Sequence, residues 1–235
     1  MKMRILKAAQ QGKIEGVAES IRAGEAVDSR DDERLTPLMY AALHGKENVC
    51  ELLLRSGAQI NTTSKSEWTP LMYAASGGNR KIVKMLLAAG AAIDARNDYG
   101  RTALIEAAYD GRDDVIEELI AAGADVNTVA HTPPGATALS EAMRQGHEST
   151  LRLLIIEGAN LRISEESGAE SVLSKFAYNG NLDLARTAIA HGANVNFVPT
   201  YGDTPLMAAV SHAGVDFVKM LLDAGADVEL KTGAG

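Results

Sequence analysis

The chain has 235 residues, 46% of them apolar and 4% aromatic, and a formal charge of −8 at pH 7. Its length and apolar content suffice for a folded core of one or two domains, whereas the negative charge argues against nucleic acid and anionic membrane surfaces as partners. The sequence has no run of 18 apolar residues that could cross a bilayer, and its single cysteine, Cys50, excludes an internal disulfide framework.

The first segment of the chain gives no sign of a targeting sequence. Its residues MKMRILKAAQQGK are too short and too polar for the apolar centre of a secretory signal. The compartment is therefore left open: the cytoplasm is the default, and a periplasmic or secreted location would require that a leader was removed. Residues 1–32 are predicted to form an N-terminal cap, with Gly16 and Ser20 making the outer face of its second helix polar.

Two ten-residue segments then agree at eight positions, TPLMYAALHG from Thr36 and TPLMYAASGG from Thr69. Related segments recur along the chain at steps of 33 to 35 residues, and a glycine follows each start by 21 residues. A period of this length predicts a stack of similar units, because one unit is too small to bury its own apolar face. The markers of the predicted units are Met3, Thr36, Thr69, Thr102, Thr137, Ser171 and Thr204.

Each unit is predicted to contain two short helices. The marker Thr suits an N-cap, and a proline directly after it, as in Pro37 and Pro70, suits the first helical position. This helix contains an Ala-Ala pair in most units and ends at a glycine nine residues after the marker, except in the last unit, which has Ala213. Apolar residues 13, 14, 17 and 18 positions after the marker predict the second helix. Helices of about two turns are stable only when their neighbours cover them.

The combination of G-x-T-P-L, the Ala-Ala pair, a glycine, a Val/Leu-Leu helix and G-A-D-V-N resembles the ankyrin-repeat family over essentially the whole chain. The resemblance implies an all-α fold, a single ankyrin-repeat solenoid over residues 1–235 with about seven helix-turn-helix units. It also implies β-hairpin fingers between the units, which form a concave groove with the first helices. The Ala-rich, Met-containing repeats further resemble stand-alone bacterial proteins, some of which act as immunity factors and others as effectors delivered into host cells.

One position departs from the family pattern in every unit. The family usually has histidine three residues after the marker, whereas this chain has Met39, Met72 and Ile105 at the second, third and fourth markers. We therefore expect packing to replace the hydrogen bonding of that histidine.

The last two units also depart from the pattern. The sixth has Ser-Val-Leu in place of Thr-Pro-Leu and alanines at core positions, so it is predicted to be the weakest unit. The seventh has an apolar second helix with no polar replacements. We expect its end either to be covered by the C-terminal tail or to be available to a partner; the residues concerned are Phe217, Val218, Leu221 and Leu222.

No catalytic residue and no cofactor are predicted. The chain lacks G-x-S-x-G, a Walker phosphate loop, H-E-x-x-H and a dinucleotide-binding glycine motif. Its histidines lie in different units without metal-ligand spacing, so no metal site is predicted, and Cys50 is expected to be a buried, inert residue. The acidic residues within 113–118 are interpreted as a solvated helix face. The protein is therefore expected not to be an enzyme.

A partner is expected to contact positions that are free of packing duty in this family, namely the finger before each marker and the residues seven and eight positions after it. Tyr and Trp, which dominate binding hot spots, gather there, whereas Tyr40 and Tyr73 on the first helices are interpreted as packing residues. Acidic residues interleave with the aromatic ones, which favours a partly basic partner surface. The predicted partner-binding residues are Asp32, Glu33, Leu35, His44, Lys65, Trp68, Asp98, Tyr99, Arg101, Tyr109, Asp110, Arg144, Tyr178, Tyr201 and Asp203.

The leading hypothesis is a non-catalytic protein-binding module, monomeric when free, that grips one protein through its groove and fingers and inhibits or masks it. Two alternatives of the binding class are an interaction domain of a larger signalling or enzyme protein and a host-directed bacterial effector. An enzyme with a dispersed site at His44, Tyr109 and Asp110 is the third hypothesis, and it has no motif in its favour.

Overall fold

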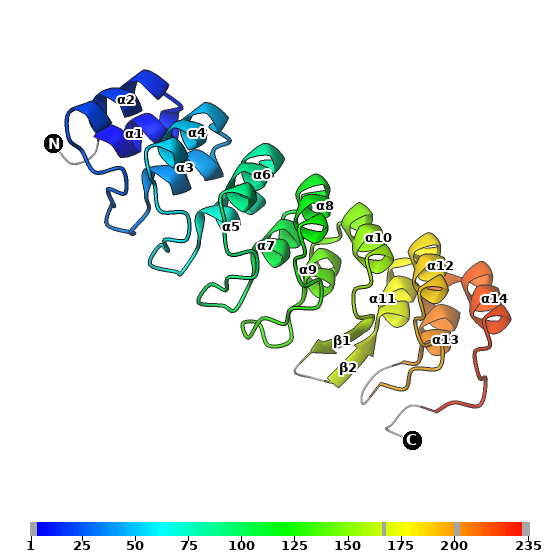
Figure 1. Ribbon diagram of the computed structural model, residues 1–235. Coiled ribbons are helices and arrows are strands. Elements are labelled where there is room, and N and C mark those ends of the chain that lie inside the picture. The colour runs from blue at the N-terminus through cyan, green and yellow to red at the C-terminus, as the bar shows by residue number, and fades with distance from the viewer. Residues whose placement is uncertain (1–3, 166–167, 200–202, 232–235) are drawn as a thin grey trace. The chain divides into compact units, whose positions relative to one another are not determined.

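The computed structural model describes residues 4–165, 168–199 and 203–231, and most of the secondary structure in these ranges is helical, which confirms the expected all-α array. The chain divides into two compact units, residues 1–130 and 131–235. Helices follow one another in pairs, each pair joined by a tight turn, and the described ranges contain seven such pairs (Figure 1).

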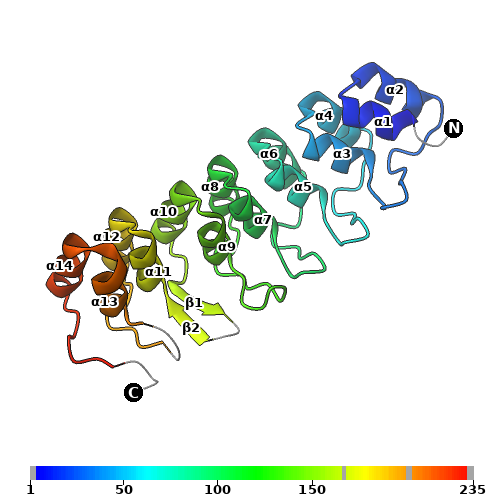
Figure 2. The ribbon, with the colours of Figure 1, turned by 180° about the vertical axis from the view of Figure 1, so that it is seen from behind.

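The first compact unit contains four helix pairs. The first helices of the pairs, α1, α3, α5 and α7, contact one another in sequence, and the second helices α2, α4, α6 and α8 form a row behind them. The connections between pairs extend from one side of these rows, as Figure 1 and the reverse view in Figure 2 both show. The helices are α1 (Arg4–Gln11), α2 (Ile14–Arg22), α3 (Pro37–Leu43), α4 (Glu47–Arg55), α5 (Pro70–Ser76), α6 (Arg80–Ala88), α7 (Ala103–Tyr109) and α8 (Asp113–Ala121).

The second compact unit repeats this arrangement with two changes. A two-stranded antiparallel sheet precedes its second helix pair, and a π-helical turn, η1, follows α13. The elements are α9 (Ala138–Gln145), α10 (Glu148–Ile156), β1 (Arg162–Glu165), β2 (Gly168–Ser171), α11 (Val172–Asn179), α12 (Leu182–Ala190), α13 (Pro205–Ala208), η1 (Ala209–Ala213) and α14 (Val215–Asp223).

The marker threonines begin the first helices as the sequence predicts. Thr36 Oγ1 accepts a hydrogen bond from the Met39 N–H at 3.3 Å, and Met39 Sδ accepts one from the Thr36 N–H at 3.4 Å. Thr69 and Met72 repeat this reciprocal cap. The expectation that packing alone replaces the family's histidine was therefore wrong at these two markers, because the buried thioether sulfur takes over as a weak acceptor.

The C-terminal end of α3 is bonded by the following helix pair. Asn79, directly before α6, donates from Nδ2 to the carbonyl oxygens of Ala42 at 2.7 Å and Leu43 at 3.3 Å, which lie in the last turn of α3. Gly45 adopts φ of 66° beside this contact, and a Cβ atom there would lie 2.6 Å from Asn79 Oδ1. Gly12, Gly45 and Gly78 thus serve both the turn and the close packing of the next pair, whereas a Cβ atom at Gly146 or Gly180 would meet nothing within 4 Å.

The connections between pairs take two forms. Strands β1 and β2 make one β-hairpin, with Arg162 opposite Ser171 in the register. In the first compact unit the corresponding segments are loops, and each is closed by a backbone hydrogen bond across four residues, from Asp31 to Leu35, Ser64 to Trp68 and Asn97 to Arg101. We call these three loops the fingers; only the β1–β2 connection has the paired strands expected of a β-hairpin finger among the described residues.

The last helix exposes less apolar surface than the sequence indicates. Phe217 and Leu221 are 1% and 0% exposed, so they belong to the core, whereas Leu222 is 44% exposed. At the other end of the chain Ser20 is buried, so it does not form the polar outer face that was expected of it. In α14 and α2, the face of the helix on which a side chain lies decides its burial, and its position in the repeat pattern alone does not.

Candidate protein-binding surface

The fingers are shaped by one polar side chain each, five residues before the marker. Asp31 Oδ1 accepts from the N–H groups of Glu33 at 2.9 Å and Leu35 at 2.8 Å. Asn97 Oδ1 holds the third finger in the same way, through the N–H groups of Tyr99 and Arg101, both at 3.0 Å. This local bonding leaves the residues at the finger tips free of packing, which is the basis on which a partner could contact them.

The same side chains tie the fingers to the first helices. The Tyr40 hydroxyl donates to Asp31 Oδ2 at 2.7 Å, and Asn97 Nδ2 donates to Glu106 Oε1 at 3.0 Å. The hydrogen bond to Asp31, together with burial, raises the pKa of Tyr40 to about 12. Burial also raises the pKa of Tyr73. The interpretation of Tyr40 as a packing residue missed this hydrogen bond, which fixes the finger on its helix.

Consecutive fingers are also joined to each other. The Lys65 N–H donates to the Glu33 carbonyl oxygen at 3.0 Å, and the Asp98 N–H donates to the Ser66 carbonyl oxygen at 3.3 Å. The Lys65 ammonium lies 3.3 Å from Glu33 Oε1, with both side chains more than half exposed. Two of the predicted contact residues thus pair with each other, although an exposed pair of this kind contributes little to stability.

Aromatic side chains gather along the fingers and first helices of the first compact unit. The rings of Trp68 and Tyr73 lie 5.1 Å apart, and those of Tyr40 and His44 stack at 6.4 Å. Trp68 is half-buried, and Tyr99 is 47% exposed. None of these rings is in the centre of the core, so all can present part of their surface to a partner.

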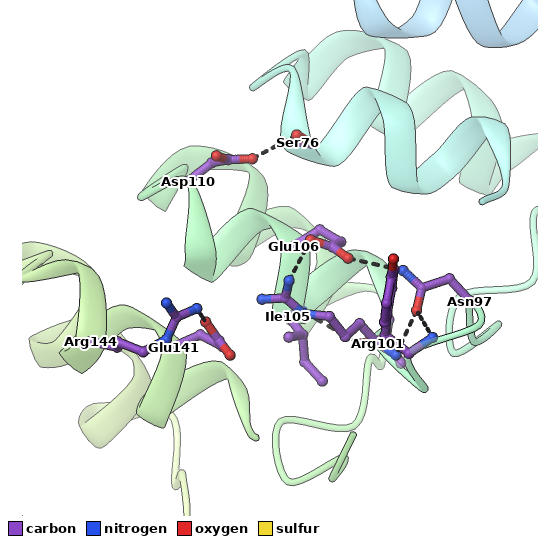
Figure 3. Close-up of polar contacts among 10 residues, drawn as sticks. Ser76, Asn97, Arg101, Ile105, Glu106, Asp110, Glu141 and Arg144 are labelled. Atoms are coloured by element: carbon purple, nitrogen blue, oxygen red, sulfur yellow. Dashed lines mark hydrogen bonds and ion pairs between the residues drawn. The ribbon is translucent and has the colours of Figure 1, made fainter. Parts of the chain in front are cut away.

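Arg101 has a different environment from the other predicted contact residues (Figure 3). Its side chain is only 13% exposed, with Nη1 3.4 Å from Glu106 Oε2, and its guanidinium lies 4.9 Å from the centre of the Tyr109 ring. Asp110 accepts a hydrogen bond from the Ser76 hydroxyl at 2.6 Å, which links α7 to α5. Arg101, Tyr109 and Asp110 therefore also help to hold the repeats together.

The second compact unit contains the remaining predicted residues. The exposed Arg144 forms an ion pair with the buried Glu141 on α9 (Figure 3). The Tyr178 hydroxyl donates to Asp203 Oδ2 at 3.1 Å, and the Tyr178 ring meets the His212 ring edge-on at 4.9 Å. Tyr201 lies outside the described residues. Among the described residues, the predicted contact residues that are exposed are Asp32, Glu33, His44, Lys65, Asp98, Tyr99, Arg144 and Tyr178.

Sequence reasoning missed two buried glutamates. The position four residues after the marker has Tyr40 and Tyr73, which were interpreted as packing residues, and Glu106 and Glu141 in the next two units, and both glutamates are at most 3% exposed. A charged residue in register with tyrosines that were expected to pack was the available signal, because a buried carboxylate needs a donor nearby. Here the donors are Asn97 and the arginines at 101 and 144.

The metal-binding and thiol groups of the described residues bear on catalysis. They contain no group of three or more His, Cys, Asp or Glu side chains that could hold a metal ion. Cys50 is fully buried, and burial raises the pKa of its thiol to about 12, which makes it unreactive as a nucleophile at neutral pH. Among the described helices none is long and apolar enough to span a bilayer.

Comparison with known proteins identifies the repeat. The family model described as ankyrin repeats (3 copies) matches residues 5–97, 44–130, 89–165 and 139–232, so the matches together extend over nearly the whole chain. A search of curated proteins finds no match.

Proposed function

Because the chain belongs to the ankyrin-repeat family, whose members generally serve as protein–protein interaction modules, we propose that it grips one specific protein partner and thereby inhibits or masks it. The family's fold is non-catalytic, and the repeats extend over nearly the whole chain. Occlusion of the partner's surface by binding is therefore the simplest mechanism, and an inhibitor of the immunity type is one form of it.

The observation that carries this proposal is the partly exposed aromatic cluster of the first compact unit. Trp68 packs at 5.1 Å against Tyr73, while the neighbouring finger presents Tyr99 at 47% exposure. Rings that are held by one neighbour and open on another side lose little conformational freedom when a partner covers them. Such residues contribute roughly 2 kcal/mol or more each at the centre of an interface.

Charge near this cluster favours a partly basic partner. Asp32, Glu33 and Asp98 are exposed at the finger tips beside the aromatic rings. Charges at the rim of an interface act mainly on the rate of association, so added salt should slow capture more than it speeds release.

The test starts from the partner recovered with the purified chain from its native lysate. We expect Trp68→Ala and Tyr99→Ala each to weaken its binding on the order of 30-fold, which corresponds to about 2 kcal/mol. Ile14→Ala is the matched control, because Ile14 is an apolar residue of α2, 37% exposed and outside the fingers. Equal affinity of the unaltered chain and both aromatic variants, measured by titration calorimetry, would show that the partner uses another surface.

A further inference from the structure

A cleft of about 370 Å³ lies between the second helices α12 and α14. Residues near the C-terminal ends of both helices line it, so α12 and α14 run in the same direction. Its floor is apolar, with Met220 only 8% exposed, whereas its charged residues are exposed. The lining residues are Arg186, Ile189, Ala190, Met220, Asp223 and Ala224.

The equivalent place between α6 and α8 is bridged by an ion pair. Lys84 Nζ lies 3.1 Å from Glu118 Oε2, 15 and 16 residues after their respective markers. At the same two positions the α12–α14 junction has Arg186 and Met220. A thioether cannot neutralise a guanidinium, so this junction combines an apolar floor with a cation that faces solvent. The cleft therefore offers both an apolar and a charged contact.

A bulky apolar residue lies on the same face one repeat earlier. Ile156 on α10 is 52% exposed and has the repeat position of Ala190, which lines the cleft. An apolar cavity of about 150 Å³ can already hold a molecule of the size of benzene, so the cleft has room for this side chain. The chain cannot place Ile156 in its own cleft, because α12 lies between α10 and α14 (Figures 1 and 2). A second copy of the chain can.

Charges around Ile156 match those around the cleft. A two-fold axis perpendicular to this face makes the second helices of the two copies antiparallel. With Ile156 in the cleft of the second copy, Arg152 comes to the C-terminal ends of the helices there, where Asp223 lies. Glu157, at the C-terminal end of α10, comes to the side of Arg186. All four charged residues are exposed, and the symmetry makes each contact twice, so the face is complementary to itself.

We propose that the face formed by α10, α12 and α14 binds a second copy of this chain, with Ile156 of each copy in the cleft of the other. This association differs from the monomeric state expected of the free chain. It uses none of the finger residues, so it is independent of the proposed function. One apolar side chain per copy and exposed ion pairs make a weak, transient pair.

Sedimentation velocity of the full chain tests the proposal at concentrations from about 5 to 500 µM, a range that covers weak pairs. We expect the weight-average sedimentation coefficient to rise toward that of a dimer. Ile156→Asp should weaken the association about tenfold or more, because it places a carboxylate against an apolar cleft. The matched control is Ile14→Asp, which adds the same charge at an apolar residue of α2 that is 37% exposed. It should leave the association unchanged.

A charge exchange tests how the two copies face each other. Arg152→Glu and Asp223→Arg should each weaken the association, because each brings like charges together in both symmetric contacts. The double variant should associate better than either single one, since opposite charges then meet again. Both residues are exposed, so the variants should keep the fold, which circular dichroism checks.

Val215→Asp distinguishes this face from the end of the array. Val215 is 82% exposed at the start of α14 and is not part of the cleft lining, so the variant should associate as the unaltered chain does. The proposal is overturned if the sedimentation coefficient stays constant over the whole range, or if Ile156→Asp loses no more association than Ile14→Asp. It is also overturned if Val215→Asp abolishes the dimer while Ile156→Asp does not, or if the double charge variant associates no better than the single ones.

Discussion

At the scale of single residues, two finger positions carry backbone strain that could be removed. Arg34 and Glu67, each two residues before a marker, adopt left-handed φ angles of 62° and 58°, and the third finger has Gly100 with φ of 75° at the same place. The N–H groups of Arg34 and Glu67 donate to the carbonyl oxygens of Asp31 and Ser64 at 3.0 and 3.2 Å, so the turn holds them in this conformation. A residue with a Cβ atom is disfavoured there by roughly 1 to 2 kcal/mol.

Glu67→Gly should therefore raise the free energy of unfolding, by up to about 1 kcal/mol after the greater freedom of glycine in the unfolded chain is deducted. Urea unfolding followed by circular dichroism gives the value. Glu67→Ala is the control, because alanine keeps the Cβ atom and should show no such gain. A glycine variant no more stable than the alanine variant would mean that the φ angle is not strained.

The N-caps of the first helices show which features single residues predict from the sequence. The marker threonines were sufficient to predict where α3, α5 and α7 begin, because a hydroxyl before a helical segment has one obvious use. The sulfur acceptors of Met39 and Met72 were not predictable, since methionine more often fills space than accepts a hydrogen bond. The burial of Glu106 depends on distances to Asn97 and Arg101 that only the folded chain fixes.

At the scale of elements, the second helices of the first compact unit alternate in charge. Arg80 on α6 lies 3.2 Å from Glu118 on α8, and Lys84 lies 3.1 Å from the same carboxylate. On the other side Lys81 lies 3.3 Å from Glu47 on α4. The acidic run on α8 is thus only in part the solvated face that the sequence indicates, because Glu118 is 18% exposed and pairs with two cations.

This pairing predicts a pH dependence of stability. Although partial desolvation raises the pKa of Glu118, its hydrogen bonds and charge interactions with Lys84 and Arg80 lower it below the ordinary 4.5 overall. A lowered folded-state pKa means that the stabilisation is fully present above the unfolded-state value and is lost as the pH falls through the folded-state value.

Glu118→Gln should accordingly lower stability by about 0.5 to 1 kcal/mol at pH 7, and the difference from the unaltered chain should shrink below pH 4.5. Urea unfolding at a series of pH values measures this difference. The control is Glu117→Gln, because Glu117 is 55% exposed and 3.7 Å from Arg80. A loss for Glu118→Gln that stays constant down to pH 3 or lower would assign the effect to packing instead of charge.

At the scale of the whole molecule, the repeats are not equally supported. The buried residues of α6 are Ile82, Val83 and Leu86, whereas those of α12 are Leu184, Ala185 and Ala188. The smaller side chains remove less apolar surface from water. The prediction from sequence that the sixth repeat is the weakest rests on this difference.

Hydrogen exchange of the intact chain should reveal this difference. We expect the amides of α12 to exchange on the order of tenfold faster or more than those of α6, because local opening removes fewer apolar contacts there. Mass spectrometry of proteolytic fragments resolves the two helices, and α8 serves as a second well-packed reference. Equal protection of α6 and α12 would indicate that the chain opens only as a whole.

The arrangement of helix pairs was readable from the sequence because the same physical problem is solved in each repeat. The marker residues, the glycines and the apolar positions recur at the same spacing, so the helices predicted for one repeat can be predicted for the others. The side-chain hydrogen bonds between repeats show the limit of this reasoning. Asp28, Asn61 and Asp94 each look like ordinary polar residues of a connection, and only the folded chain shows that each accepts from a backbone N–H of the next repeat.

The hydrogen bonds between neighbouring repeats also bear on how such a gene can grow. Asp28 accepts from the Gln59 N–H and Asp94 accepts from the Asp125 N–H, in both cases 31 residues further along the chain. A tandem duplication of one whole repeat in this region would present each of these donors with the same kind of acceptor as before, so the added copy could pack against its neighbours without further substitutions.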